Sequence, residues 1–226
     1  MDADADLAAP AKLMGDPARA AMLTALLDGR SLPASDLAAI AGVAAPTASS
    51  HLAQLVEGGL VVATRSGRHR YFSLAGAEVA RAVEALQAIA PRRPVTSYAG
   101  SRAAKRLAEA RSCYDHLAGR LALDLADALV GEGSIEPLGI GQPGSLTDRP
   151  GPLAMRLGLD RVPPTGKRPA VRGCLDWTER RPHLAGAVGA HMLGVLLADG
   201  LLVRDRDDRG LTPTPEGAAW FATFAR

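Results

Sequence analysis

The chain has 226 residues, of which 47% are hydrophobic and 22% are charged, and its net charge is only +2. This composition is typical of a folded globular protein with one or two domains, and it excludes a disordered chain and a disulfide-rich miniprotein. Because the chain has no overall basic field, a nucleic-acid partner would have to contact a local basic patch.

Neither a secretion signal nor a membrane span is predicted. The first ten residues contain no basic segment followed by an apolar one, and the chain has only two cysteines, which favours a cytoplasmic protein. The most apolar run, residues 184–203, is interrupted by His191 and Asp199. We therefore expect a buried helix there and no membrane partner.

The N-terminal part of the sequence predicts consecutive short helices. Asp16, followed by a proline, is typical of a helix N-terminus, and this helix is expected to end at Gly29. Pro33 begins a second helix that ends at Gly42, and Pro46 begins a third. Two short helices joined by a glycine-containing turn are typical of a helix-turn-helix.

A β-hairpin and another helix complete the first predicted domain. Residues 60–65 and 70–74 are rich in β-branched and aromatic side chains, and the segment SGRH at 66–69 between them is typical of a hairpin turn. Residues 77–90 carry the apolar stripe of a helix that ends before Pro91. We therefore expect a first domain of residues 1–90, in which the hairpin is a wing.

These segments together resemble the ArsR (arsenic-repressor) family of bacterial winged-helix regulators. The similarity covers about residues 7–90 and is carried by LMGDPAR (13–19), VAAPTASSHLAQL (43–55), GLV (59–61) and RSGRHRYF (65–72). It implies a DNA-binding homodimer whose protomers meet through the helix at 77–90. The metal-binding cysteines and histidines of many members have no counterparts at 33–38 or 77–90, so the resemblance implies no metal site in this domain.

The predicted DNA contacts lie on the third helix and on the wing. Small and polar side chains opposite the apolar stripe of the helix suit a major groove; these are Thr47, Ser49, Ser50, His51 and Gln54. Basic side chains on a wing suit phosphates or a minor groove; these are Arg65, Arg68, His69 and Arg70.

Residues 91–100 (PRRPVTSYAG) predict a linker, and residues 101–226 predict a C-terminal sensing or stabilising domain. A long helix is expected from Ser101 to Leu129, because apolar residues recur every three or four positions. A loop (131–152), a short helix (153–157), a buried strand (171–177), a helix (182–199), a hairpin (201–212) and a last helix (215–224) are expected to follow. The predicted fold class is therefore mainly α with small β-hairpin wings: a winged helix-turn-helix followed by a C-terminal winged-helix-like α/β domain.

Candidate effector residues lie in two segments of the C-terminal domain, CYDH at 113–116 and CLDWTERRPH at 174–183, both similar to segments of a long ArsR-like subgroup. They are Cys113, Tyr114, His116, Cys174, Trp177 and His183. Two thiolates and two imidazoles match a zinc ligand set, and the thiols also match a redox couple. The loose spacing and the two aromatic side chains favour an organic ligand, so no bound metal or cofactor is predicted, and roles in packing alone stay open.

The sequence therefore predicts a homodimeric repressor that leaves its DNA operator when a small-molecule effector binds the C-terminal domain. Two alternatives stay open: a thiol-redox or metal-responsive regulator that uses Cys113 and Cys174, and a winged-helix module that binds protein instead of DNA. An enzyme is not expected, because the sequence contains no glycine-rich phosphate loop, no GxSxG motif and no HExxH motif.

Overall fold

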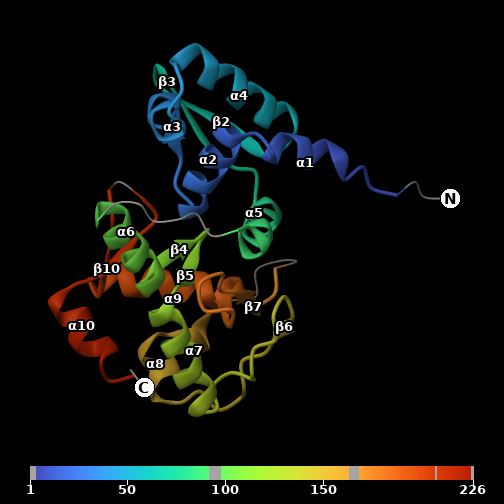
Figure 1. The fold of residues 1–226 in the computed structure, drawn as a ribbon. Coiled ribbons are helices and arrows are strands. Elements are labelled where there is room, and N and C mark those ends of the chain that lie inside the picture. Colours follow the sequence, from blue (N-terminus) through green and yellow to red (C-terminus); the bar gives the residue numbers. More distant parts are fainter. Residues whose placement is uncertain (1–3, 92–97, 163–167, 207, 225–226) are drawn as a thin grey trace. The chain divides into compact units, whose positions relative to one another are not determined.

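The computed structural model describes residues 4–91, 98–162, 168–206 and 208–224. They belong to two compact units, residues 1–86 and residues 87–226 (Figure 1). The predicted linker at 91–100 falls largely on residues 92–97, which lie outside the described part. No helix of the described part combines the length and the apolar character that crossing a bilayer requires.

The N-terminal unit is built on helices α1 (Ala8–Met14), α2 (Pro17–Ala25), α3 (Ala34–Ala41) and α4 (Ala45–Glu57) and on most of α5 (Ala77–Ile89), with a 3₁₀ turn, η1, at Leu26–Asp28. As predicted, Asp16 caps α2, because its carboxylate accepts the backbone N–H of Arg19 at 3.0 Å. Gly42 has a φ of +66° and turns the chain between α3 and α4. These two helices form the predicted helix-turn-helix.

The wing is an antiparallel hairpin of β2 (Val61–Ser66) and β3 (His69–Leu74), to which the short strand β1 (Leu32–Pro33) adds on the β3 side. Ser66 pairs with His69, so the connection is a two-residue turn, and Gly67 in that turn has a φ of +59°. The inward side chains Phe72 and Leu74 are buried. They hold the base of the hairpin on the helices and leave its tip exposed.

The C-terminal unit contains helices α6 (Tyr98–Glu109), α7 (Arg120–Gly131), α8 (Pro152–Arg156), α9 (Gly186–Ala198) and α10 (Pro215–Phe221), and a 3₁₀ turn, η2, at Leu159–Arg161. Its strands are β4 (Arg111–Cys113), β5 (His116–Ala118), β6 (Pro143–Gly144), β7 (Val171–Leu175), β8 (Pro182–Ala185), β9 (Leu202–Arg204) and β10 (Leu211–Pro213). They form two hairpins, β4–β5 and β9–β10, and a sheet in the order β6–β7–β8. The predicted hairpin at 201–212 corresponds to β9–β10 and the predicted last helix to α10.

The long helix predicted from Ser101 to Leu129 is wrong, because the hairpin β4–β5 separates α6 from α7. Apolar residues still recur every three or four positions, but Tyr114 has a φ of +60°, which no α-helix accommodates. Gly119 has a φ of +94°, and a side chain there would lie 2.7 Å from the carbonyl oxygen of Ala108. The helical stripe therefore continues through two helices and a buried hairpin.

The helix predicted at 182–199 also begins later than expected. Residues 182–185 form β8, which pairs with β7, and α9 starts only at Gly186, where φ is +85°. Both helices α7 and α9 pack on this strand region, and a single apolar core results. Its members include Leu117, Leu121, Leu125, Leu129, Val171, Leu184, Val188 and Leu196.

A buried ion pair ties several of these elements together. Arg111 and Asp176 are 1% and 0% exposed, and the Arg111 Nη2 donates to Asp176 Oδ2 at 2.8 Å. The same carboxylate accepts the backbone N–H of Gly119 at 2.7 Å, just before α7, and the backbone N–H and hydroxyl of Thr178 after β7. Its charge is therefore compensated by the guanidinium and by the surrounding donors.

Candidate functional site

The exposed face of α4 carries small polar side chains. Leu52 and Leu55 are buried against the unit, whereas Thr47, Ser49 and Ser50 are exposed. Pro46 lies in the first turn of the helix, where backbone N–H groups have no acceptor within the helix. The missing N–H of proline therefore has no cost there. The amphipathic pattern therefore orients α4 so that its short side chains face solvent. Short side chains allow a helix to come close to the base edges of a major groove, which bulky side chains would prevent.

His51 and Gln54, which were also predicted to contact DNA, are held by Arg19. The Arg19 Nη1 donates to the side-chain oxygen of Gln54 at 2.8 Å and lies 3.4 Å from Nδ1 of His51. Its other nitrogens donate to the carbonyl oxygens of Leu13 and Lys12 at 2.7 and 3.0 Å. Arg19 therefore links the N-terminal helices to α4 and fixes the helix that presents Ser49 and Ser50.

The four predicted wing residues all lie on the exposed part of the hairpin: Arg65, Arg68, His69 and Arg70. Arg65 and Arg70 are cross-strand partners, so their charges lie side by side. The guanidinium of Arg70 lies over the Phe72 ring at 5.4 Å from its centroid. Within the described residues no carboxylate forms an ion pair with these arginines, so their charge is available to an anionic partner.

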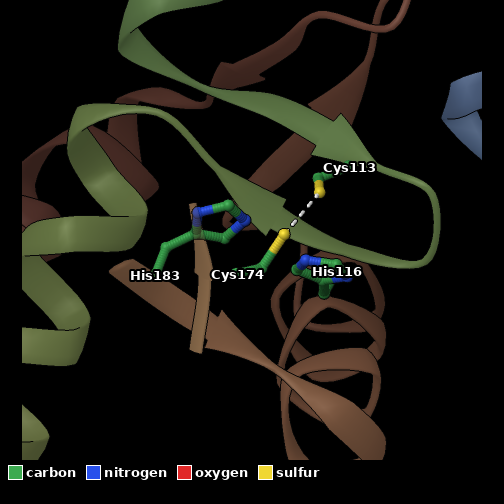
Figure 2. A group of neighbouring side chains, drawn as sticks. All are labelled: Cys113, His116, Cys174 and His183. Carbon is green, nitrogen blue, oxygen red and sulfur yellow. Dashed lines mark hydrogen bonds between the residues drawn. The ribbon is translucent and has the colours of Figure 1, made fainter. Parts of the chain in front are cut away.

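In the C-terminal unit, four of the six candidate effector residues converge: Cys113 on β4, His116 on β5, Cys174 on β7 and His183 on β8 (Figure 2). We call them the Cys-His cluster. In each strand pair a cysteine lies directly opposite a histidine, with Cys113 paired to His116 and Cys174 paired to His183. One ligand atom from each residue lies within 4.8 Å of all the others, and the two sulfur atoms are 3.7 Å apart.

Burial and proximity shift the protonation of the Cys-His cluster. The hydrogen bond between Cys113 and Cys174 lowers the pKa of Cys174; burial opposes this, and His116 and His183 lower the pKa further. Burial lowers the pKa of His183 more than the neighbouring Cys174 raises it, so this imidazole is neutral. The rings of His116 and His183 are stacked, with centroids 5.1 Å apart. The Cys-His cluster therefore combines a thiol with a lowered pKa and an imidazole with a lowered pKa.

The two aromatic candidates lie beside the Cys-His cluster in sequence but are not part of it. Tyr114 is half-buried in the turn between β4 and β5. Trp177 stacks on the guanidinium of Arg111, with the ring centroid 4.8 Å away. Four of the six predicted residues therefore converge, and the other two, Tyr114 and Trp177, lie in separate surroundings.

Comparison with known proteins identifies the family. The helix-turn-helix domain family matches residues 14–63. The HTH-type transcriptional regulator YdfF of Bacillus subtilis (strain 168) is 37% identical over 217 residues, which cover 96% of this chain and 95% of YdfF. The chain belongs to the HTH-type transcriptional regulators.

Other similar proteins match a smaller part of this chain than YdfF does. The HTH-type transcriptional regulator CmtR of Mycobacterium tuberculosis (strain H37Rv) is 43% identical over 77 residues, or 34% of this chain and 64% of CmtR. An NMR structure of the cadmium metal-sensor CMTR from Mycobacterium tuberculosis shares 36% identity and covers 41% of this chain and 99% of that protein, with a TM-score of 0.32. The prediction of a DNA-binding transcriptional regulator with a helix-turn-helix is confirmed.

Three residues of the regulator that support its candidate sites were missed by sequence reasoning. Arg19 fixes α4, as described above. Asp115 lies 3.2 Å from Nδ1 of His116 and accepts two hydrogen bonds from Arg168, at 2.6 and 3.0 Å. The sequence contained only a weak signal for Asp115, its place beside His116, and none for the two arginines, because their partners are distant in the chain.

Proposed function

We propose that the regulator is a repressor that binds operator DNA as a homodimer and is released when an effector occupies its C-terminal unit. The observation that carries this proposal is the exposed polar face of α4 in the same unit as an exposed wing with three arginines. A helix with short side chains suits a major groove, and arginines without acidic partners suit phosphates.

The proposal assigns different roles to the helix and the wing. Ser49 and Ser50, with Thr47, contact base edges, because their side chains are exposed near the N-terminal end of α4. Arg65, Arg68 and Arg70 neutralise phosphates and therefore contribute affinity that is independent of sequence. His51 and Gln54 act through Arg19 by holding α4 in place, in addition to any contact of their own with DNA.

The dimer is proposed to form through α5. Val83 of this helix is buried within its own chain, but Leu86 and Ile89 are 46% and 79% exposed. Two large apolar side chains about one turn apart on a helix form a stripe that a second copy of the same helix is able to cover. Twofold symmetry then predicts an operator with two half-sites about 34 Å apart, one turn of DNA.

An effector changes operator affinity only if it binds the DNA-competent and DNA-incompetent forms differently. The C-terminal unit is the proposed location of this effector, because the Cys-His cluster lies there with three of its four side chains buried. The proposal thus separates a DNA-binding unit from a sensing unit in the same chain.

The test is binding of the full-length protein to fluorescent DNA from upstream of its own gene, measured by anisotropy with unlabelled competitor of unrelated sequence. A preference of at least about 10³-fold for one site, lost when the site is scrambled, supports the proposal. Equal affinity for both DNAs at physiological salt refutes operator recognition. In that case a search for bound proteins addresses the alternative, a winged-helix module that recognises protein.

A further inference from the structure

We propose that the Cys-His cluster is a tetrahedral metal site that takes a thiophilic divalent cation, with Zn²⁺ as the best match, and that this ion is the effector of the regulator. The metal site stands on the geometry of the C-terminal unit alone. The effector role rests on the proposed function, so the two parts are tested separately.

The spacing of the ligand atoms matches a tetrahedral ion. Two thiolates that each lie about 2.3 Å from a tetrahedral Zn²⁺ are separated by about 3.8 Å, and two imidazole nitrogens by about 3.3 Å. The sulfur atoms of Cys113 and Cys174 lie 3.7 Å apart, and all four ligand atoms lie within 4.8 Å of one another. The sulfur separation therefore already matches a tetrahedral site, and the other separations exceed the ideal values by at most about 1.5 Å.

His183 distinguishes a ligand site from ordinary core packing. Its side chain is 1% exposed, and its ring nitrogens interact with the nearby Cys174 sulfur but do not reach the geometry of a regular hydrogen bond. A buried polar atom without a partner costs free energy, and a bound ion is one of the recognised explanations for such an atom. Figure 2 shows that this ring and the Cys174 sulfur approach each other, so an ion between them would supply the missing interaction.

His116 is positioned as metal-ligating histidines usually are. Its Nδ1 lies 3.2 Å from the carboxylate of Asp115, and Arg168 donates both to that carboxylate and to the carbonyl oxygen of Gly186, at 2.8 Å. When Nδ1 carries the proton that it donates to Asp115, Nε2 is the nitrogen that binds metal. Asp115 is thus a positioning residue, which fixes both the tautomer and the orientation of the ring.

The ligand set selects the ion. Two sulfur and two nitrogen donors suit Zn²⁺ and disfavour Mg²⁺ and Ca²⁺, which require oxygen ligands. On binding, any proton that a thiol still carries is released to solvent, and the two thiolate charges balance the charge of the cation. Four protein ligands leave no open position, so the site is suited to holding two strand pairs together and not to catalysis.

Binding would join β4–β5 to β7–β8. Without metal, these strand pairs meet through their side chains, whereas four coordinate bonds would fix their separation. Only Ala110 separates β4 from the end of α6, so a constraint on this hairpin is also a constraint on the direction of that helix. The metal-bound and metal-free forms of the regulator would therefore differ in structure. Such a difference is what a metal needs in order to change operator affinity.

The experiment uses full-length protein stripped with EDTA under reducing conditions and titrated with Co²⁺, whose absorption reports tetrahedral sulfur coordination. We expect one equivalent to bind and one equivalent of Zn²⁺ to displace it. Cys174→Ser and His183→Gln should lose this spectrum while circular dichroism shows that they fold. His191→Gln is the matched control, because His191 lies on α9 near the Leu157 carbonyl, outside the cluster, and it should bind as the wild type does.

The second measurement is operator affinity with and without one equivalent of Zn²⁺. We expect Zn²⁺ to weaken binding by about tenfold or more in the wild type and in His191→Gln, and to have no effect on Cys174→Ser. Absence of a tetrahedral Co²⁺ spectrum in the reduced wild type, or its persistence in Cys174→Ser, would overturn the metal site.

Unchanged operator affinity in metal-loaded protein would overturn the effector role and leave the metal site standing. Affinity that responds to oxidant and not to Zn²⁺, together with a Cys113–Cys174 disulfide detected by mass spectrometry, would assign the role to a thiol switch instead. Failure of the metal-free protein to bind any operator would refute the proposed function, while the Co²⁺ titration would still decide the metal site.

Discussion

The buried pair of Arg111 and Asp176 should dominate the stability of the C-terminal unit, and replacing Asp176 with alanine tests this. The substitution leaves a 1% exposed guanidinium without its counter-charge. It also removes the acceptor for the Gly119 N–H and for the backbone and hydroxyl of Thr178. Removal of one member of a buried, hydrogen-bonded pair costs about 3–5 kcal/mol, which is much of the stability of an ordinary domain.

A surface pair of similar length provides the control. Arg181 donates to Asp127 at 2.7 Å, but the two side chains are 54% and 31% exposed. Water and salt screen such a pair, so Asp127→Ala should cost about 1 kcal/mol or less. The two variants therefore separate the effect of burial from the effect of simply breaking an arginine–aspartate contact.

The assay is urea or thermal unfolding followed by tryptophan fluorescence. Both tryptophans of the chain, Trp177 and Trp220, lie in the C-terminal unit, so the signal reports this unit and not the winged helix. EDTA and a thiol reductant keep the Cys-His cluster in the same state in every sample. We expect Asp176→Ala to lower the Tm by on the order of 10 °C and Asp127→Ala by a few degrees or less. Equal losses for the two variants would refute the reasoning that burial makes the Asp176 pair critical.

Three further predictions follow from the proposed sites. The double variant Arg68→Ala/Arg70→Ala should weaken binding to operator and to unrelated DNA alike and reduce the slope of log affinity against log salt by about 2; anisotropy at several salt concentrations measures this, and an unchanged slope removes the wing from the interface. Leu86→Glu should place a charge in the α5 interface and give monomers in sedimentation; a persistent dimer would mean that another surface joins the protomers. Asp115→Asn should keep one metal ion per chain but lower its affinity by about 10–100-fold in competition with a chelator; unaltered affinity would show that Asp115 does not orient His116.

Much of the N-terminal unit could be predicted from sequence because its signals are local. Asp16 and the proline after it begin α2, Gly42 turns the chain within the helix-turn-helix, and Gly67 turns the wing. Each of these residues acts on backbone within a few positions, so a short stretch of sequence contains the whole physical cause. The predicted helix at 77–90 and the observed α5 at Ala77–Ile89 differ by one residue for the same reason.

The C-terminal unit was harder to predict because the decisive contacts are distant in the chain. The apolar stripe from Leu107 to Leu129 fits one long helix as well as it fits two helices with a hairpin between them. The hairpin forms because Gly119 allows the chain to pass close to the end of α6 and because Asp176 accepts the Gly119 N–H from 57 residues away. No local pattern encodes a backbone donor whose acceptor lies in another strand pair.

The sequence by itself determined the winged helix, the exposed polar face of α4 and the residue types of a possible ligand set in the C-terminal half. It also placed Cys113 and His116, and Cys174 and His183, in two short segments, but it could not say that these segments meet. Only the tertiary structure brought together two sulfur atoms that are 61 residues apart in the chain. The physical reason is strand register: in each pair a cysteine lies opposite a histidine, and burial of the core places the two pairs with these four side chains facing one another.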